Sequence, residues 1–350
     1  MFELCLFDLD DTLVLSSDMS KIRLSGRGID TREYRNKVQE AYRTNGCRKI
    51  YKQDDLLLLK ERMTSVKLGV FTRSPRAYAS TILEEAYPEI QWDVIIAYED
   101  AKWTKPFGEG IRRAMDDLDI DRLDKVVLVG DGDADIRAAY NGGVPVVLDR
   151  SSWAESRSSD NWRAINHMPD AIIDAPEELL DVLQSLPSHS LELERLLAQA
   201  APVERTRFDW IGKFVPDGIG VQTGPHKVFT CGRSFANYES LSERRKWHLL
   251  SASIQENKES SEFPTEWIQA LKGFIRRTFW NVRRPPALVV TVVPHRPGRT
   301  PRLENMLLQL ERSVRYDKFY HQRNIIFEPQ VLAYRDGVRS QSGEHLSKVE

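Results

Sequence analysis

The first 150 residues alternate short apolar runs with amphipathic ones, and this alternation constrains the fold more than any other feature of the chain. It is typical of βαβ units that build a parallel sheet. The sequence predicts strands at 2–8, 66–72, 93–97, 125–130 and 144–148. It predicts helices at 75–86, 106–118 and 133–141, each with Pro or Asp at its start. We therefore expect an α/β domain with a doubly wound parallel sheet, closed near Leu186 by a last strand and helix in IIDAPEELLDVLQSL.

The length of the chain predicts a second domain, because 350 residues exceed what a single hydrophobic core usually supports. We expect domain 1–186, a helical linker at 187–204, and a basic accessory domain of α/β or α+β type at 205–350. The two parts of the chain also differ in net charge. Residues 1–190 carry 25 basic against 34 acidic side chains, and residues 191–350 carry 25 against 18. Residues 287–314 predict a buried strand, a loop rich in Pro and Arg, and an amphipathic helix.

Composition excludes several classes of protein. Hydrophobic residues make up 41% of the chain and charged residues 29%, as in ordinary globular proteins. No apolar run approaches the roughly 20 residues of a membrane span, and the acidic start MFELCLFDLDD is unlike a secretory signal. Cys5, Cys47 and Cys231 lie far apart and form no CxxC, which argues against a disulfide framework and a thiolate zinc site. These features predict a cytoplasmic protein without a membrane partner.

Acidic residues, a hydroxyl and a lysine follow the predicted strands, in the motifs FDLDDTL, GVFTRS, TKPFGEG and VVLVGDGDAD. The residues concerned are Asp8, Asp10, Thr72, Lys105, Asp131 and Asp135. Carboxyl ends of parallel strands meet at one edge of an open sheet, where ligands bind. Carboxylates brought together there repel one another unless a hard cation neutralises them, and ligands that are all oxygen predict Mg²⁺. The predicted metal ligands are Asp8, Asp10, Asp131 and Asp135.

These residue types suit phosphoryl transfer. An Asp carboxylate can attack phosphorus and form an aspartyl-phosphate that water hydrolyses. A second carboxyl two residues later can act as general acid and then as general base. A hydroxyl and a lysine that converge on the transferring group lower the barrier electrostatically, which suits Thr72 and Lys105. Lys102 is an alternative to Lys105, and we expect Asp133 to be an exposed residue at a helix start and not a ligand.

In order, type and spacing, the four motifs resemble those of the haloacid dehalogenase-like hydrolase superfamily, over roughly residues 1–186. The resemblance implies a Rossmann-like sheet with a helical cap. It further implies Asp8 as nucleophile, Asp10 as acid/base and donor of a backbone carbonyl to Mg²⁺, Thr72 and Lys105 as phosphate binders, and Asp131 with Asp135 as holders of the metal. The acid at position 10 is unlike the dehalogenase branch, and Leu9 is unlike the transport ATPases. A phosphatase is therefore the favoured branch.

The insert at about 14–65 predicts a small cap, with room for two or three short helices. In the superfamily, small caps leave the site open to bulky substrates, which here would be a nucleotide, a nucleic-acid end or a phosphoprotein. Residues 19–53 hold 10 basic and 3 acidic side chains, which either overhang the site and attract anions or form a solvated helix face. The basic residues in question are Arg23, Arg27, Arg32, Arg35, Arg43, Arg48 and Lys49.

The C-terminal region leaves alternatives open. Its ending, LAYRDGVRSQSGEHLSKVE, resembles the segment before the phosphoribosyl-diphosphate loop of competence-associated phosphoribosyltransferases, but the DDxxTTG motif of that family does not follow. The region is either part of a longer fusion, a binding module or an unrelated α+β domain. Arg296 and Arg299 are candidates to hold a diphosphate, or are solvated. Its aromatic residues predict a core in preference to stacking on single-stranded nucleic acid: Trp210, Phe235, Tyr238, Trp247, Trp267, Trp280 and Tyr320.

The leading hypothesis is therefore a Mg²⁺-dependent phosphomonoester hydrolase that acts through an aspartyl-phosphate. The alternative is a binding or regulatory protein with a vestigial phosphatase fold and a C-terminal domain that binds a phosphoribosyl group or nucleic acid.

Overall fold

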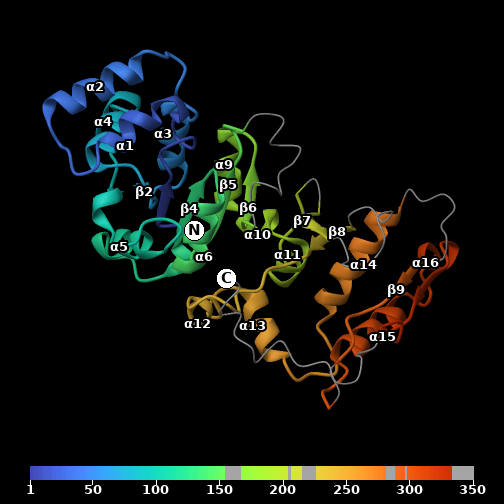
Figure 1. Cartoon of the computed structure of the whole chain (residues 1–350). Helices are drawn as coiled ribbons and strands as arrows, with labels where there is room; N and C mark the ends of the chain where they lie inside the picture. The colour runs from blue at the N-terminus through green and yellow to red at the C-terminus, as the bar shows by residue number, and fades with distance from the viewer. Residues whose placement is uncertain (154–166, 204–205, 215–225, 281–287, 296–297, 333–350) are drawn as a thin grey trace. The chain divides into compact units, whose positions relative to one another are not determined.

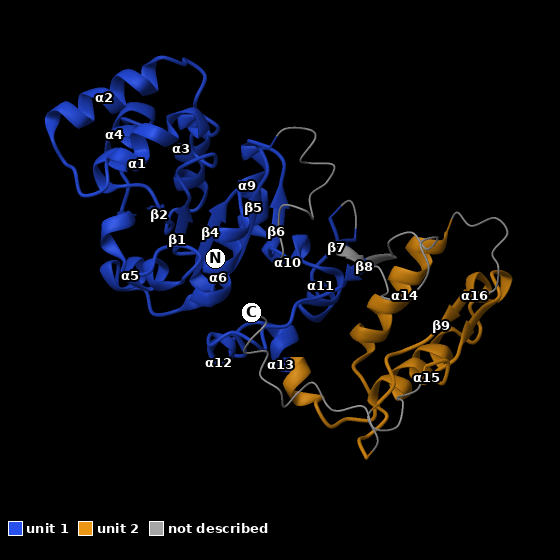
Figure 2. Cartoon of the chain, viewed as in Figure 1, with its two compact units in different colours: residues 1–252 blue, residues 253–350 orange. Residues whose placement is uncertain are grey.

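The computed structural model describes residues 1–153, 167–203, 206–214, 226–280, 288–295 and 298–332. No helix within these ranges is long and apolar enough to cross a bilayer. The chain divides into two compact units, Met1–Ala252 and Ser253–Glu350, which Figure 2 colours separately. The division thus lies later in the chain than the linker expected at 187–204.

A six-stranded parallel sheet forms the centre of the first unit (Figure 1). Its strands are β1 (Leu4–Phe7), β2 (Lys67–Phe71), β3 (Val94–Ile96), β4 (Val126–Gly130), β5 (Val146–Asp149) and β6 (Ala171–Ile173). Their order across the sheet is β3-β2-β1-β4-β5-β6, and Leu6 of β1 pairs with Gly69 on one side and Leu128 on the other. The strand order reverses at β1, so a crevice for ligands is expected at the carboxyl ends of β1 and β4. The predicted parallel sheet is confirmed.

Helices cover both faces of the sheet because successive strand residues point to opposite sides. On β1, Cys5 and Phe7 pack into one apolar cluster, and Leu4 and Leu6 pack into another. The first cluster includes residues of α3 (Gln53–Arg62), α4 (Arg76–Ala86) and α9 (Leu179–Gln184). The second includes residues of α5 (Glu109–Asp117) and α6 (Asp133–Gly142). The helices expected at 75–86, 106–118 and 133–141 are therefore confirmed as α4, α5 and α6.

The insert after β1 forms the expected small helical cap. It consists of a 3-10 turn at Ser17–Met19 followed by α1 (Ser20–Ser25), α2 (Arg32–Arg43) and α3. The Thr31 side chain caps α2 by accepting a hydrogen bond from the backbone N–H of Tyr34 at 3.2 Å. The buried Arg48 guanidinium pairs with Asp18 at 2.7 Å and donates to the carbonyl oxygen of Tyr42 at 2.8 Å. Arg48 therefore holds the insert together internally.

Residues 187–252 form an extension of the first unit that packs on the second apolar cluster. Its elements are α10 (Leu186–His189), α11 (Glu192–Leu197), the antiparallel pair β7 (Asp209–Phe214) and β8 (His226–Thr230), α12 (Leu241–Arg244) and the start of α13 (Leu249–Glu256). Leu191 and Phe235 are fully buried in that cluster, beside residues of α6. The predicted helical character of 187–204 is thus present as α10 and α11, but these helices belong to the core of the unit.

Two buried arginines attach the extension to the sheet and to α6. Arg233 forms ion pairs with Asp170, which precedes β6, at 2.7 Å and with Glu194 of α11 at 2.5 Å. Arg244 is fully buried and donates to the carbonyl oxygen of Ala139 near the end of α6 at 2.8 Å. These contacts explain why the division of the chain does not fall at the predicted linker.

The second unit contains α14 (Thr265–Phe279), β9 (Leu288–Val290), α15 (Arg302–Val314), α16 (Lys318–Gln322) and β10 (Ile325–Phe327). The strands β9 and β10 pair in parallel, with Val289 opposite Ile326. The predicted amphipathic helix is confirmed as α15, whose Leu307 and Leu310 are buried. The predicted strand is present as β9, but the expectation that it is buried was wrong. Val289 is 46% exposed because the helices of this unit cover only the face to which Val290 points.

Several aromatic residues of the C-terminal region belong to cores, as predicted. Phe235 and Tyr320 are buried, whereas Trp280 is 58% exposed and stacks on Phe319 at a centroid distance of 5.9 Å. The Trp210 side chain, Arg296 and residues 333–350 lie outside the described residues. The phosphoribosyltransferase resemblance rests on that last segment and stays a prediction.

Candidate active site

Three of the predicted carboxylates meet at the carboxyl ends of β1 and β4. Asp8 directly follows β1, Asp131 directly follows β4, and Asp135 lies in the first turn of α6. One oxygen of each side chain lies within 4.8 Å of the others. The backbone N–H of Gly132, just before α6, donates to Asp135 Oδ2 at 3.2 Å and fixes the orientation of that carboxylate. The strand-end placement that the sequence predicted therefore brings these three side chains together.

The last residue of β4, Gly130, leaves the space that Asp135 occupies. A Cβ atom at position 130 would lie 2.3 Å from Asp135 Cγ, which is closer than non-bonded carbons approach. On the other side, Trp153 Nε1 donates to the backbone oxygen of Asp131 at 3.0 Å. Neither residue was predicted as part of the site from the sequence. Gly130 lies inside the VVLVGDGDAD motif, but nothing in the sequence links Trp153 to the site.

Lys105 extends from the segment between β3 and α5 into the carboxylate cluster. Its Nζ lies 2.8 Å from Asp8 Oδ1 and 2.6 Å from Asp135 Oδ1, and its side chain is only 1% exposed. The alternative, Lys102, is exposed, and its Nζ lies 5.5 Å from the centroid of the Trp103 ring. The structure therefore brings Lys105, and not Lys102, to the predicted site.

Burial and mutual repulsion perturb the cluster. Burial, followed by the charges of Asp135 and Asp8, raises the pKa of Asp131 to about 9. Burial also raises the pKa of Asp8, and Lys105 opposes that rise. Burial lowers the pKa of Lys105, but the attraction of Asp135 and Asp8 outweighs it, so the pKa lies above its ordinary value.

The donor set fits a hard divalent cation. Three carboxylates and one ammonium group leave a formal charge of −2 when all are ionised, and all three acidic donors are oxygen atoms. Mg²⁺ prefers such ligands. A divalent ion would therefore neutralise the cluster and lower the raised pKa of Asp131.

The Asp10 carboxylate is held apart from this cluster. Asp10 lies in a tight turn after β1, and its side chain accepts hydrogen bonds from Ser16 Oγ at 2.5 Å, Tyr78 OH at 3.2 Å and Ser74 Oγ. It also pairs with Arg23 of α1 at 2.9 Å. The structure therefore does not place the Asp10 side chain among the predicted metal ligands, because these donors already hold it. The resemblance assigned only its backbone carbonyl to Mg²⁺.

Thr72 follows β2 and is buried at the same edge of the sheet. Its backbone N–H donates to the Ile96 oxygen at 2.9 Å, and its Oγ1 accepts from the backbone N–H of Ser74 at 3.0 Å. No motif in the sequence predicted the three hydroxyl donors to Asp10. Ser74 had a usable signal, since it lies two residues after Thr72 in the GVFTRS motif.

A cavity of about 340 Å³ opens at the site. It is lined by Asp8, Asp10, Asp11, Arg23, Leu24, Arg27, Thr72, Arg73, Ser74, Pro75 and Asp131. Arg23, Leu24 and Arg27 come from α1 and the turn after it, so the small cap reaches the predicted catalytic residues. The Arg27 guanidinium lies 4.4 Å from the centroid of the Tyr98 ring.

Only part of the basic insert lines this cavity. Arg23 and Arg27 do, whereas three of the other arginines form ion pairs elsewhere on the insert or on α4. These pairs are Arg35 with Asp30, Arg43 with Glu85, and Arg48 with Asp18. Of the two alternatives that the sequence left open, Arg23 and Arg27 fit the first, since they lie at the site. The other three do not overhang it, because local acidic partners hold their side chains.

Parts of the chain are similar to known proteins. The curated phosphoglycolate phosphatase of a Cupriavidus necator plasmid is 34% identical over 93 residues, which are 27% of this chain and 40% of that protein. The chain thus spans less than half the length of this relative. A predicted phosphoglycolate phosphatase of Haemophilus somnus is 18% identical, with a TM-score of 0.40 over 52% of this chain and 98% of that one.

A second solved structure is a haloacid dehalogenase superfamily hydrolase of Geobacter sulfurreducens. It is 16% identical, with a TM-score of 0.36 over 52% of this chain and 100% of that one. Likeness at this level says nothing about activity. The model of the haloacid dehalogenase-like hydrolase family matches residues 25–148, which include Thr72, Lys105, Asp131 and Asp135 but not Asp8 or Asp10. Residues 25–148 are thus similar to this family over about a third of the chain.

Proposed function

We propose that the chain is a Mg²⁺-dependent phosphomonoesterase that acts through an aspartyl-phosphate on Asp8. The observation that supports this most strongly is the convergence of Asp8, Asp131 and Asp135 around Lys105 at the reversal point of the sheet. The phosphatase relative named above supports the same reaction class.

Asp8, Asp131 and Asp135 would hold the metal, together with the backbone carbonyl of Asp10. When bound, the ion offsets the repulsion between the Asp8 carboxylate and a phosphoryl group.

In the proposed reaction, an Asp8 oxygen attacks phosphorus while the bond from phosphorus to the leaving oxygen breaks. Asp10 gives that oxygen a proton, and later takes a proton from the water that cleaves the aspartyl-phosphate. Thr72 and Lys105 stabilise the negative charge on the transferring group. The hydrogen bonds from Ser16 and Tyr78 hold Asp10 in position.

Replacing Lys105 with Gln is expected to lower kcat by about 100- to 1,000-fold, because a buried cation no longer faces the phosphoryl group. Lys102→Gln is the matched control, since Lys102 is exposed on the same segment. Steady-state hydrolysis of p-nitrophenyl phosphate with Mg²⁺ measures both variants. Equal losses in the two variants would contradict the role of Lys105.

The cationic rim of the cavity supports a substrate with a second anionic group beside its phosphate. Within the described part of the chain, Arg27 and Arg73 form no ion pair with an acidic side chain. They are therefore free to contact a carboxylate or a second phosphate. Phosphoglycolate, phosphorylated oligonucleotide ends and acidic phosphopeptides carry such a group, whereas a nucleoside monophosphate does not. A panel of all four would identify the substrate.

The double variant Arg27→Gln/Arg73→Gln is expected to raise KM for phosphoglycolate by about tenfold at low ionic strength, with little change in kcat, because two exposed cations attract the anion. The increase should shrink at high salt as the charges are screened. For ethyl phosphate, which lacks the second anion, the increase should be smaller. An unchanged KM for phosphoglycolate at low salt would rule out this rim as a binding element.

A further inference from the structure

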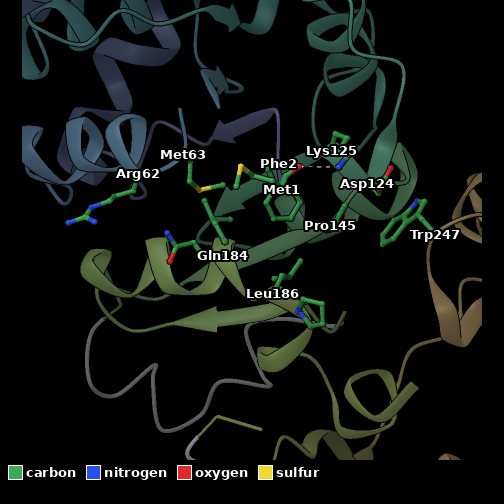
Figure 3. A pocket seen from close by; sticks show the side chains of 12 residues that line it. Met1, Phe2, Arg62, Met63, Asp124, Lys125, Pro145, Gln184, Leu186 and Trp247 are labelled. Atoms are coloured by element: carbon green, nitrogen blue, oxygen red, sulfur yellow. Dashed lines mark hydrogen bonds between the residues drawn. The ribbon is translucent and has the colours of Figure 1, made fainter. Parts of the chain in front are cut away.

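A second cavity, of about 590 Å³, is drawn in Figure 3. Its lining includes residues that lie just before three strands of the sheet. These are Phe2 before β1, Lys125 before β4 and Pro145 before β5. The cavity is therefore at the amino ends of the strands, whereas the carboxylate cluster is at their carboxyl ends. Its volume is in the range of small-molecule sites.

The lining of this cavity is mostly apolar. It consists of Met1, Phe2, Arg62, Met63, Asp124, Lys125, Pro145, Leu183, Gln184, Leu186, Pro187 and Trp247. In Figure 3, Arg62 lies at one end, Phe2 and Met63 lie between, and Trp247 lies at the other end. Trp247 belongs to the extension, outside the segment that matches the family model. The cavity thus depends on a part of the chain that the phosphatase motifs do not require.

The charged groups around the cavity leave an excess of positive charge. Within the described residues, Arg62 has no acidic partner, and Lys125 Nζ donates to the backbone oxygen of Met1 at 3.2 Å. The carboxylate of Asp124 is already engaged by Arg122, at 3.0 and 2.6 Å. The two cations are therefore not neutralised by the one acid that lines the cavity.

We propose that this cavity binds an elongated apolar molecule that carries one anionic group, with a medium-chain carboxylate as its simplest form. The apolar chain would lie against Phe2, Met63 and Leu186, which removes its surface from water. The anionic group would contact Arg62 or Lys125 at the solvent-exposed rim, where a carboxylate keeps part of its hydration. This site is independent of the proposed phosphatase reaction.

The full chain and octanoate test the proposal. The fluorescent probe anilinonaphthalene sulfonate, which is itself an apolar anion, is expected to bind at one site per chain and to be displaced by octanoate. Octanamide has the same chain without the charge, and should compete at least about fivefold more weakly because it gains no ion pair. Failure of octanoate to displace the probe, or equal competition by octanamide, would overturn the proposal.

Methionine methyl groups locate the bound molecule. Met1 and Met63 line the cavity, whereas Met19, Met115 and Met168 are buried elsewhere in the first unit and Met306 belongs to the second. In methyl NMR spectra of the full chain, octanoate is expected to shift the signals of Met1 and Met63 and to leave those of the other four methionines unchanged. Shifts that spare Met63 would place the binding site elsewhere and overturn the assignment.

Variants separate the two parts of the site. Leu186→Trp fills the cavity and should abolish displaceable probe binding, while Arg62→Gln/Lys125→Gln should weaken octanoate about fivefold and leave octanamide unchanged. Arg32→Gln, an exposed residue of α2 outside the cavity, is the matched control. The charge variants change residues at the rim and so test the proposal even where Leu186→Trp fails to fold. Unchanged octanoate affinity in the double variant would overturn the role of the cations.

Discussion

Replacing Asp8 with Asn is expected to lower kcat/KM for p-nitrophenyl phosphate by at least about a thousandfold, because the amide cannot attack phosphorus. The fold should survive the change, since Asp8 repels Asp131 and Asp135 and its neutralisation relieves that repulsion. The measurement is Mg²⁺-dependent hydrolysis by the full chain, with mass spectrometry of the quenched reaction to detect a phosphorylated Asp8 in the unchanged protein.

The control for this prediction is Asp116→Asn, which removes an exposed carboxylate from α5 and should leave activity unchanged. Activity of Asp8→Asn equal to that of the unchanged chain would show that Asp8 is not the nucleophile. If neither the unchanged chain nor Asp8→Asn hydrolyses any substrate of the panel, the result would favour the alternative hypothesis of a binding protein over that of a phosphatase. The cavity at the amino ends of the strands is unaffected by either result, because its test measures binding alone.

Replacing Arg233 with Met is expected to destabilise the first unit by about 3–5 kcal/mol at pH 7, because it leaves two carboxylates buried without their cation. Arg233 pairs with Asp170 at 2.7 Å and with Glu194 at 2.5 Å, and all three residues are buried. Arg113→Met is the control. Arg113 is exposed and pairs with Asp117 within α5, so its loss should cost less than about 1 kcal/mol.

The loss of stability in Arg233→Met should depend on pH, because the two carboxylates that pair with Arg233 titrate. Burial raises the pKa of Glu194, but Arg233 and His248 outweigh burial and hold it well below its ordinary value of 4.5. The pKa of Asp170 is lowered in the same way by Arg233. A carboxylate whose pKa is depressed on folding stabilises the protein above its unfolded pKa, and that contribution is lost as the pH falls. The unchanged protein should therefore lose stability below about pH 4.5.

In Arg233→Met, burial without the guanidinium favours the protonated acids, so the difference between variant and unchanged protein should narrow as the pH falls from 7 to 4. Urea unfolding followed by reaction of Cys5 with 4,4′-dithiodipyridine, which reacts with exposed thiols at pH 4 as well as at pH 7, measures this. The Cys5 thiol is buried in β1 and reports on the first unit alone. A variant that exposes Cys5 at the same urea concentration as the unchanged protein, at both pH values, would contradict the prediction.

The sequence predicted the strands and the aspartates at their ends, but not the partners that hold Asp10. The runs that became β1, β2 and β4 are short and apolar, and each ends at a polar motif, so both the strands and the meeting of Asp8 with Asp131 followed from local pattern. The surroundings of Asp10 did not follow from local pattern. Its partners Ser16 and Tyr78 come from the cap and from α4, and hydroxyl groups on separate elements leave no periodic signal in a sequence.

The division of the chain also depended on contacts between distant segments. Residues 187–204 look like a linker because they combine Pro, Ser and charged residues. Ion pairs between Arg233, Asp170 and Glu194 instead hold this stretch in the first unit, and these residues are up to 63 positions apart.

The sequence by itself determined the parallel sheet, the cap and the three aspartates that form the acidic cluster, though not the exclusion of the Asp10 side chain from it. Apolar periodicity and strand-end motifs are local properties of a chain. Only the tertiary structure decided that Lys105 and not Lys102 joins the cluster, that Arg233 and Arg244 bind the extension, and that a cavity forms beside Trp247. Each of these depends on which side chains meet when distant segments pack, and the free energy of such contacts is not encoded in any one stretch of residues.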